Sequence, residues 1–342
     1  DSAIFMHPQV WKASGHVDNF SDPMIDNKDS KKRYRVDHLI EGFIEELKRK
    51  AFEKIRGKSE DSLLDEGHIV SVADEDVIKD ENYLKAIQLE KDLDKLIAAD
   101  DFAGLKQLIE DNKIACSVSK TVNWTDVRQF NLMFSTEVGS VAEESSKIYL
   151  RPETAQGIFV NFLNVQKTAR MKIPFGIAQI GKAFRNEIVA RGFIFRMREF
   201  EQMEMQFFVR PGTQKEWYEY WKAERLKWHL DLGIDPAKYR YHDHVKLAHY
   251  ADAACDIEFD FPMGFKELEG IHSRTDFDLK SHQELSKKKM QYFDADVDPE
   301  TGKAYGNYIP YVIETSIGLD RAFLAVLSEA YEEEDLSTEE KQ

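Results

Sequence analysis

The stretch from Pro174 to Val209 constrains the possible fold more than any other part of the sequence. Residues 175–185 and 195–209 are rich in apolar and aromatic side chains, and the polar run 186–192 between them includes a glycine that suits a turn. The pattern predicts two antiparallel strands joined by a short loop. Because such a hairpin does not fit an alternating strand–helix–strand order, we expect an α+β fold, with an antiparallel sheet flanked by helices.

One face of the predicted return strand is unusual for a buried core. Side chains alternate across a strand, so this face carries an aromatic ring, two carboxamides and a carboxylate. A ring can stack on a base, and a guanidinium can bind a phosphate through two hydrogen bonds, which together favour a nucleotide site. The alternative is an amphipathic hairpin whose charged groups only face water. The residues concerned are Phe200, Gln202, Glu204 and Gln206, with Arg185 and Glu187 sharing a face on the outgoing side.

Length and composition set broad limits. A chain of 342 residues can form one large or two ordinary domains, and 42% hydrophobic residues indicate a soluble globular protein. No apolar run approaches the roughly 20 residues of a membrane span, and we expect no signal peptide. The formal charge of −16 disfavours nonspecific coating of nucleic acid but permits a local basic patch. The two cysteines give no disulfide framework and suit a reducing cytoplasm.

Apolar residues at helical spacing predict several helices. The first begins at Asp37, a second covers residues 82–98, a shorter one follows from Asp101, and a fourth covers residues 212–232. Basic side chains of the first helix could contact a phosphate backbone. Glutamates interleave with them, however, so a solvated helix face is the simpler interpretation. The aromatic residues of the fourth helix are expected to pack in the core.

Three further segments carry chemically informative residues. In RPETAQG, residues 151–157, Pro152 suits the first turn of a helix, and Glu153 could simply interact with that helix's dipole. The segment FKELEGIHSRTDFDL covers residues 265–279. In ETSIGLDR, residues 314–321, a strand runs through a glycine into an apolar helix; the alternative here is a strand-to-helix corner with an incidental salt bridge.

Taken together, these segments resemble the class II aminoacyl-tRNA synthetases, and in detail the glycyl-tRNA synthetases. FRNE followed by FRMREFEQMEMQFF resembles motif 2, and ETSIGLDR resembles motif 3. Residues 1–27 resemble the later part of motif 1, which forms the dimer interface in this family. The family's leading helix and its anticodon-binding domain are not found, so we expect a trimmed piece of a longer protein. The resemblance implies four parts: the end of the motif 1 region (1–30), a charged helical insertion (31–115), a catalytic core (116–331) and an acidic tail (332–342).

The resemblance implies that the protein activates glycine with ATP and Mg²⁺ and transfers it to tRNA(Gly), as a homodimer in the cytoplasm. The first step joins two anions, so it needs cations and alignment. Arg185 is expected to bind the α-phosphate and the attacking carboxylate, Arg196 and Arg321 the outer phosphates, while Phe200 and Arg321 enclose adenine. The resemblance implies Arg185, Arg321 and Glu314 as catalytic residues, and Glu267 and Glu314 as candidates to hold Mg²⁺. The full set at the ATP site is Arg185, Asn186, Glu187, Phe195, Arg196, Phe200, Glu267, Leu268, Gly318 and Arg321, with Arg274 nearby.

Glycine has no side chain to bind, so selectivity requires a grip on its ammonium group and no space beyond Cα. Glu153, Glu204 and Ser316 have the chemistry for this and belong to three separate motifs. The resemblance implies the set Arg35, Glu153, Phe200, Gln202, Glu204, Glu314 and Ser316 for glycine.

Some relatives carry two CxxC pairs that bind zinc. This chain has Asn27 and Ser30 at the first pair and only Cys116 at the second, so we expect no structural zinc. Histidines 242, 244 and 249 are expected to be structural rather than metal ligands. Two other functions stay open: a catalytically silent, synthetase-like binding module, and an adenylate-forming enzyme with an acceptor other than tRNA.

Overall fold

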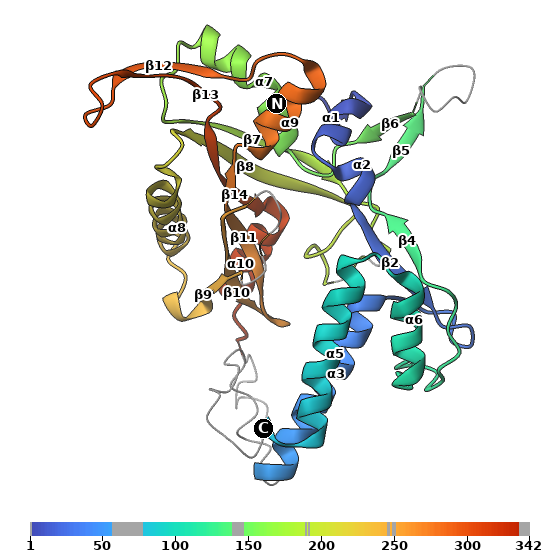
Figure 1. Cartoon of the computed structure of the whole chain (residues 1–342). Helices are drawn as coiled ribbons and strands as arrows, with labels where there is room; N and C mark the ends of the chain where they lie inside the picture. Colours follow the sequence, from blue (N-terminus) through green and yellow to red (C-terminus); the bar gives the residue numbers. More distant parts are fainter. Residues whose placement is uncertain are drawn as a thin grey trace. The chain divides into compact units, whose positions relative to one another are not determined.

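A computed structural model describes residues 2–56, 78–138, 147–188, 190, 192–244, 247 and 251–334. The chain forms two compact units (Figure 1). The larger unit comprises residues 1–20 and 132–342, and the smaller unit comprises residues 21–131. His249 and residues 335–342 of the acidic tail lie outside the described residues.

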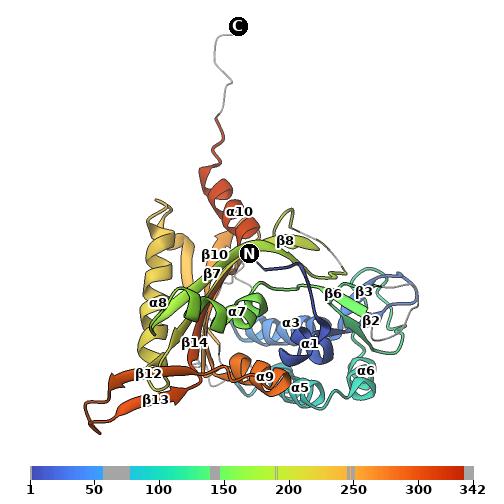
Figure 2. The same cartoon turned by 90° about the horizontal axis from the view of Figure 1, so that it is seen from above.

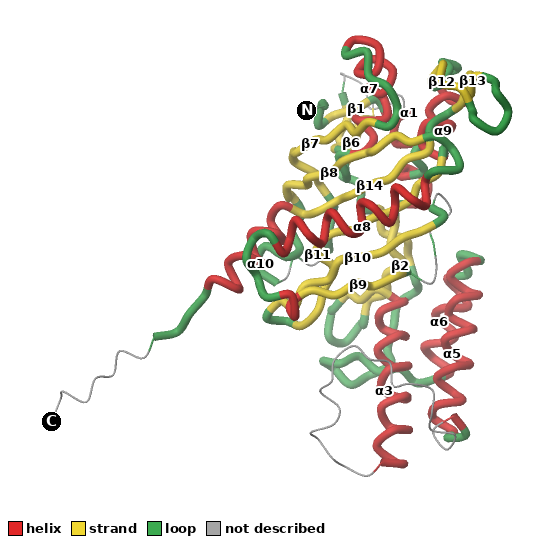
Figure 3. The backbone as a smooth tube through the Cα atoms, turned by 90° about the vertical axis from the view of Figure 1, so that its left-hand side faces the viewer, coloured by secondary structure: helices red, strands yellow, loops and turns green. Residues whose placement is uncertain are grey.

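The larger unit is built on a six-stranded sheet in which every neighbouring pair of strands is antiparallel (Figure 3). This confirms the predicted α+β fold with an antiparallel sheet flanked by helices. In spatial order the strands are β7 (Phe175–Phe184), β8 (Glu199–Val209), β14 (Tyr311–Gly318), β11 (Gly264–Thr275), β10 (Ala253–Phe261) and β9 (Tyr239–Asp243).

Strands β7 and β8 form the hairpin predicted from the sequence, with Phe184 opposite Glu199 at the end where the loop joins them. The predicted strands were slightly too long, since they included Arg185 and began again at Phe195. Phe195 cannot continue the ladder because its N–H donates to the carbonyl of Gly192 within the turn, at 2.9 Å. Along β8 the exposure alternates as expected, with Gln202, Glu204 and Gln206 all buried on one face.

Helices cover both faces of the sheet. On one face α8 (Gln214–Leu230) brings Trp217 and Trp221 against Phe207, with ring centroids 4.9 and 5.2 Å apart. This confirms the packing role expected for Trp217 and Trp221, whereas Tyr220 and Trp228 of the same helix are exposed, so for these two the prediction was wrong. On the other face lies α7 (Ala155–Thr168), as Figure 2 shows. Its Phe162 packs against Phe208, with ring centroids 4.6 Å apart. The neighbouring residues Phe207 and Phe208 therefore pack against helices on opposite faces of the sheet.

The larger unit also contains several shorter elements. They are α1 (Pro8–Ala13), α2 (His16–Asn19), η3 (Pro236–Lys238), α9 (Phe277–Ser286), α10 (Leu319–Ala330), the small sheet of β1 (Phe5–Met6), β6 (Lys147–Leu150) and β5 (Ser135–Glu137), and the pair β12 (Tyr292–Val297) and β13 (Ala304–Tyr308).

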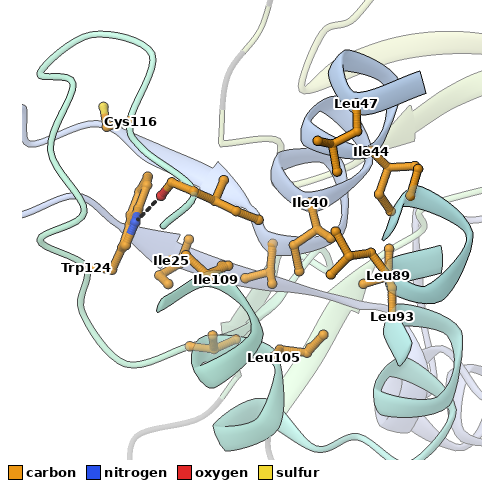
Figure 4. Close-up of a cluster of buried hydrophobic side chains, with 14 residues drawn as sticks. Ile25, Ile40, Ile44, Leu47, Leu89, Leu93, Leu105, Ile109, Cys116 and Trp124 are labelled. Atoms are coloured by element: carbon orange, nitrogen blue, oxygen red, sulfur yellow. Dashed lines mark hydrogen bonds between the residues drawn. The ribbon is translucent and has the colours of Figure 1, made fainter. Parts of the chain in front are cut away.

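The smaller unit contains the three helices that the apolar spacing predicted. These are α3 (Val36–Arg56), α5 (Glu81–Ala98) and α6 (Phe102–Asp111), and they accompany a sheet of β3 (Arg33–Arg35), β2 (Ser21–Asp26) and β4 (Arg128–Asn131). Figure 4 shows their core, in which Ile40, Leu93, Leu105 and Ile109 are buried together. The indole of Trp124 donates to the carbonyl of Ile114 at 2.9 Å, so the one polar atom of this ring is satisfied inside the core.

Among the residues described, no helix is both long enough and apolar enough to cross a membrane.

Candidate functional site

A cavity of about 170 Å³ opens where the end of the β7–β8 hairpin meets β14 and α10. Eight of the ten residues predicted for ATP line it, together with Gln202 and Ser316 from the predicted glycine set. The eight are Arg185, Glu187, Phe195, Arg196, Phe200, Glu267, Gly318 and Arg321. Asn186 and Leu268 are not part of the lining. Leu268 lies in the apolar core, and the N–H of Asn186 donates to Leu132.

Arg185 is held between two aromatic rings. Its guanidinium carbon lies 5.5 Å from the ring centroid of Phe20 and 5.4 Å from that of Phe200, and its Nε donates to the carbonyl of Pro152 at 3.1 Å. Stacking of this kind orients the planar guanidinium without neutralising its charge. The side chain can therefore present a fixed positive charge to an anion.

Arg321, from the first turn of α10, is fixed from another side of the cavity. Its Nε donates to the carbonyl of Phe195 at 3.1 Å, its Nη1 donates to the carbonyl of Glu267 at 3.0 Å, and it lies over the Phe195 ring at 4.2 Å. Phe195, rather than Phe200, is thus the ring in direct contact with Arg321. Burial lowers the pKa of Arg321, and the nearby cations Arg196 and Arg185 lower it further. Crowded positive charge of this kind attracts anionic groups.

A second cluster, which we call the carboxylate cluster, consists of Glu153, Glu204 and Glu314. The pairing of β8 with β14 places Glu204 opposite Ser316 and Gln206 opposite Glu314. Nε2 of Gln206 donates to Glu314 at 2.7 Å and to Glu204 at 3.3 Å, so it bridges two of the three acids. Ser316 accepts a hydrogen bond from Gln202 at 2.7 Å, and both line the neighbouring cavity.

The three carboxylates have different partners. Glu314 accepts from Arg274 at 2.9 Å and contacts His272 at 3.1 Å. Burial alone would raise the pKa of Glu314, but Arg274 and His272 hold it well below its usual range. Glu204 accepts instead from the backbone N–H and hydroxyl of Thr154.

The uncharged partners of Glu204 leave its charge uncompensated. Burial, together with the charges of Glu314 and Glu153, therefore raises the pKa of Glu204. The carboxylate cluster thus combines ionised acids with one acid that tends to keep its proton.

Glu153 is not part of a helix, contrary to one interpretation of the sequence. Helix α7 begins at Ala155, so Pro152 and Glu153 precede it, and no acidic residue lies in its first turn. Glu153 faces His16 instead, with Nε2 and Oε2 3.3 Å apart. Glu153 therefore interacts with the side chain of His16 rather than with the dipole of α7.

Arg274 contacts the carboxylate cluster through Glu314 and is not part of the lining of the cavity. It joins Glu314 to Asp278, to which its Nε and Nη2 donate at 2.8 and 3.1 Å. Sequence reasoning missed the contributions of His16, Thr154, His272 and Asp278. The signal for His272 is its position two residues before Arg274 on β11, although a register shift between Ser273 and Thr275 interrupts the strict alternation there. No comparable signal marks His16, which lies far away along the sequence.

Of the two carboxylates expected to hold Mg²⁺, Glu267 lines the cavity, with Oε2 3.5 Å from Nη1 of Arg321. Glu314 lies outside the lining, and both of its oxygens already have hydrogen-bonding partners. A single exposed carboxylate beside an arginine-lined cavity suits Mg²⁺, which usually takes one or two protein carboxylates and keeps several waters. Glu267 is therefore the better fit.

Arg35 lies in the smaller unit, where it pairs with Asp22 at 3.2 Å and with Asp37 at 2.5 Å. Its role toward glycine stays a prediction.

The positions of the two CxxC pairs do come together in the smaller unit. Ser30 lies 3.3 Å from the sulfur of Cys116, and Ser119 donates to Asn27 at 2.9 Å. Hydrogen bonds thus join these side chains directly. Within the part of the chain that the structure describes, no three His, Cys, Asp or Glu side chains form a metal-binding group. The expectation of no structural zinc stays a prediction.

Comparison with known proteins agrees with this geometry. Residues 134–331 match the family model of the tRNA synthetase class II core domain (G, H, P, S and T), and residues 22–132 match that of glycyl-tRNA synthetase insertion domain 1. A glycine–tRNA ligase of Chlorobaculum tepidum is 51% identical over 98% of this chain and 64% of its own length. One of Staphylococcus aureus is 48% identical over 98% of this chain and 62% of its own length. The chain therefore spans less than two thirds of these relatives.

The two models account for nearly the whole described chain, and the predicted motifs 2 and 3 fall within the matched core. The chain belongs to the class II tRNA synthetases and, among them, to the glycyl-tRNA synthetase family.

Proposed function

We propose that this chain carries the catalytic part of a glycine–tRNA ligase, which activates glycine with ATP and transfers it to the 3′ end of tRNA(Gly). The observation that carries the proposal is that an arginine-lined cavity and the carboxylate cluster share one end of the sheet. Ser316 connects them, since it lines the cavity and pairs in register with Glu204. The names of the relatives support the same reaction.

In the first step a carboxylate oxygen of glycine attacks the α-phosphorus of ATP. A new P–O bond forms, the bond to the bridging oxygen breaks, and pyrophosphate leaves with the electron pair. Both reactants are anionic, so alignment between cations lowers the barrier. We assign Arg185 to the α-phosphate and the attacking carboxylate, because the rings of Phe20 and Phe200 fix its guanidinium.

Arg196 and Arg321 are assigned to the outer phosphates and the leaving pyrophosphate. Arg196 pairs with Glu187 at 3.3 Å, which holds its guanidinium at the cavity wall. Adenine is assigned to the space between Phe200 and Arg321, both of which line the cavity. Bound Mg²⁺, held by Glu267 and the phosphates, would neutralise charge on the leaving group.

Glycine selectivity follows from the carboxylate cluster. Glu153 and Glu204 are assigned to the ammonium group, whose positive charge favours the ionised form of Glu204. Ser316 and Gln202 close the pocket beside it. Glu314 keeps the pocket negative, since its carboxylate stays ionised between Arg274 and His272. A pocket built from short hydrogen-bonded groups leaves no apolar recess for a larger side chain, so larger amino acids lose affinity.

The test is ATP–pyrophosphate exchange with a panel of amino acids. We expect exchange with glycine alone, with losses of about 100-fold or more for Arg185→Ala and Glu204→Gln. Arg210→Ala is the matched control for the first, because Arg210 lies at the far end of β8 and pairs with Asp294. Glu201→Gln is the control for the second, because Glu201 lies on β8 but on the opposite face. Exchange with alanine at a comparable rate would overturn the assignment.

This assay and a tRNA(Gly) charging assay together separate the other functions. A silent binding module would show no glycine-dependent exchange, whereas an enzyme with another acceptor would exchange but fail to charge tRNA(Gly). We further propose a homodimer acting in the cytoplasm, which sedimentation of the full-length protein would test.

A further inference from the structure

The segment from Trp11 to Phe20 contributes side chains to both parts of the site. Ser14, Gly15 and His16 form a turn between α1 and α2, and Gly15 has the left-handed φ of +81° that allows α2 to start at His16. The imidazole of His16 reaches Glu153 in the carboxylate cluster. Nothing in the proposed reaction yet uses this histidine.

The His16 ring is held from several directions. Its Nδ1 lies 2.8 Å from the hydroxyl of Ser14, which itself donates to the carbonyl of Trp11 at 3.1 Å. The rings of Trp11 and Phe20 meet it edge to face, at 5.6 and 5.1 Å. With Nδ1 and the ring faces engaged, Nε2 is directed to Glu153. These contacts fix the orientation of the His16 ring, which is not expected for a surface histidine that meets a carboxylate by chance.

The contact with His16 favours the ionised form of the Glu153 carboxylate. Its other oxygen accepts from Gln156 at 3.0 Å, and Glu314 is a like charge nearby. Burial alone would raise the pKa of Glu153, but His16 and, less strongly, Arg274 lower it to about 2. An ionised and oriented carboxylate is what an incoming ammonium group requires.

We propose that His16 is a positioning residue of the amino-acid pocket, which holds the Glu153 carboxylate for the ammonium group of glycine. This proposal rests on the proposed function. His16 need not touch the substrate, because its effect is transmitted through Glu153. Phe20 in the same segment instead lies against Arg185, which we assigned to the α-phosphate.

The contacts of His16 with Glu153 and of Phe20 with Arg185 predict kinetic effects on different substrates. In glycine-dependent ATP–pyrophosphate exchange, His16→Ala should raise the KM for glycine about tenfold or more and leave the KM for ATP within about twofold. His16→Gln keeps one N–H donor and should recover part of the loss. Phe20→Leu should raise the KM for ATP more than the KM for glycine. His242→Gln is the control, since that histidine is exposed on β9 and should change neither value.

The outcomes separate this proposal from the proposed function. If His16→Ala raises both KM values equally, or lowers only the melting temperature, His16 has a general structural role and the proposal is overturned. An unchanged KM for glycine in His16→Ala overturns it too. Absence of glycine-dependent exchange in the unmodified protein would instead overturn the proposed function, and with it this inference.

Discussion

Arg274 gives the sharpest test of the electrostatics of the site. The residue is 5% exposed, and its guanidinium donates to Asp278 at 2.8 and 3.1 Å and to Glu314 at 2.9 Å. Burial alone would lower the pKa of Arg274, but the surrounding carboxylates raise it well above its ordinary value, so the side chain stays charged. Replacement by methionine keeps much of the side-chain volume and removes the charge. It therefore leaves two buried carboxylates without their shared cation.

Loss of one partner of a buried ion pair typically costs about 3–5 kcal/mol, because the remaining charge is stranded. Two remaining contacts reduce the free-energy cost of removing Arg274. Glu314 still contacts His272 at 3.1 Å and accepts from Gln206 at 2.7 Å. We therefore expect Arg274→Met to lower the free energy of unfolding by about 3 kcal/mol, near the lower end of that range.

Urea unfolding of the chain, followed by tryptophan fluorescence, measures this cost. Arg49→Met is the matched control, since Arg49 makes an exposed pair with Glu53 on α3 and should cost less than about 1 kcal/mol. The double variant Arg274→Met/Asp278→Asn removes one stranded charge and should be more stable than Arg274→Met alone. A cost below about 1 kcal/mol for Arg274→Met, or a double variant no more stable than the single one, would refute the reasoning.

Three other predictions concern stability. The pKa of Glu204 is raised in the folded chain, so the folded state binds the proton of Glu204 more tightly than the unfolded state does. The stability that this proton contributes is present at low pH and is lost as the pH rises past the pKa of Glu204 in the unfolded chain. The melting temperature of Glu204→Gln should therefore rise relative to that of the unmodified protein as the pH increases above the ordinary glutamate pKa of about 4.3, and a constant difference would contradict this. Ile109→Ala in the core of the smaller unit should cost about 2–5 kcal/mol in urea unfolding, whereas the exposed Val118→Ala should cost almost nothing. Gly15→Ala should cost about 1–2 kcal/mol in thermal unfolding because alanine resists the left-handed conformation, and an unchanged melting temperature would show that the turn can relax.

The elements predicted best are those whose side-chain periodicity extends over many residues. Helix α3 and strand β8 have long runs at spacing 3.6 and 2, and the structure places both where the pattern indicated. Their ends were less predictable, because an end depends on local competition for hydrogen bonds. The turn contact of Phe195 and the late start of α7 at Ala155 are examples.

The candidate site was predicted by a different route. The side chains that line the cavity were identified by resemblance, since no periodicity relates Arg185 to Arg321. Supporting residues such as His16 and Thr154 carry no local pattern, because what matters is the partner each one meets in the folded chain. Thr154 illustrates this, since it occupies a position next to a helix start yet uses its N–H and hydroxyl to hold Glu204, 50 positions along the chain.

The pairing of β8 with β14 links the stability of the fold to the chemistry of the site. Phe207 on β8 packs against the tryptophans of α8, while Glu204 and Gln206 point to the opposite face. Shifting the register by one residue would turn Glu204 and Gln206 toward the tryptophans of α8 and move Phe207 away from them, so the apolar residues strongly disfavour any other register. The same register sets Glu204 opposite Ser316 and Gln206 opposite Glu314. The packing of the apolar residues of β8 therefore also fixes the positions of its polar residues. This register alone brings Glu204 of β8 close to Glu314 of β14.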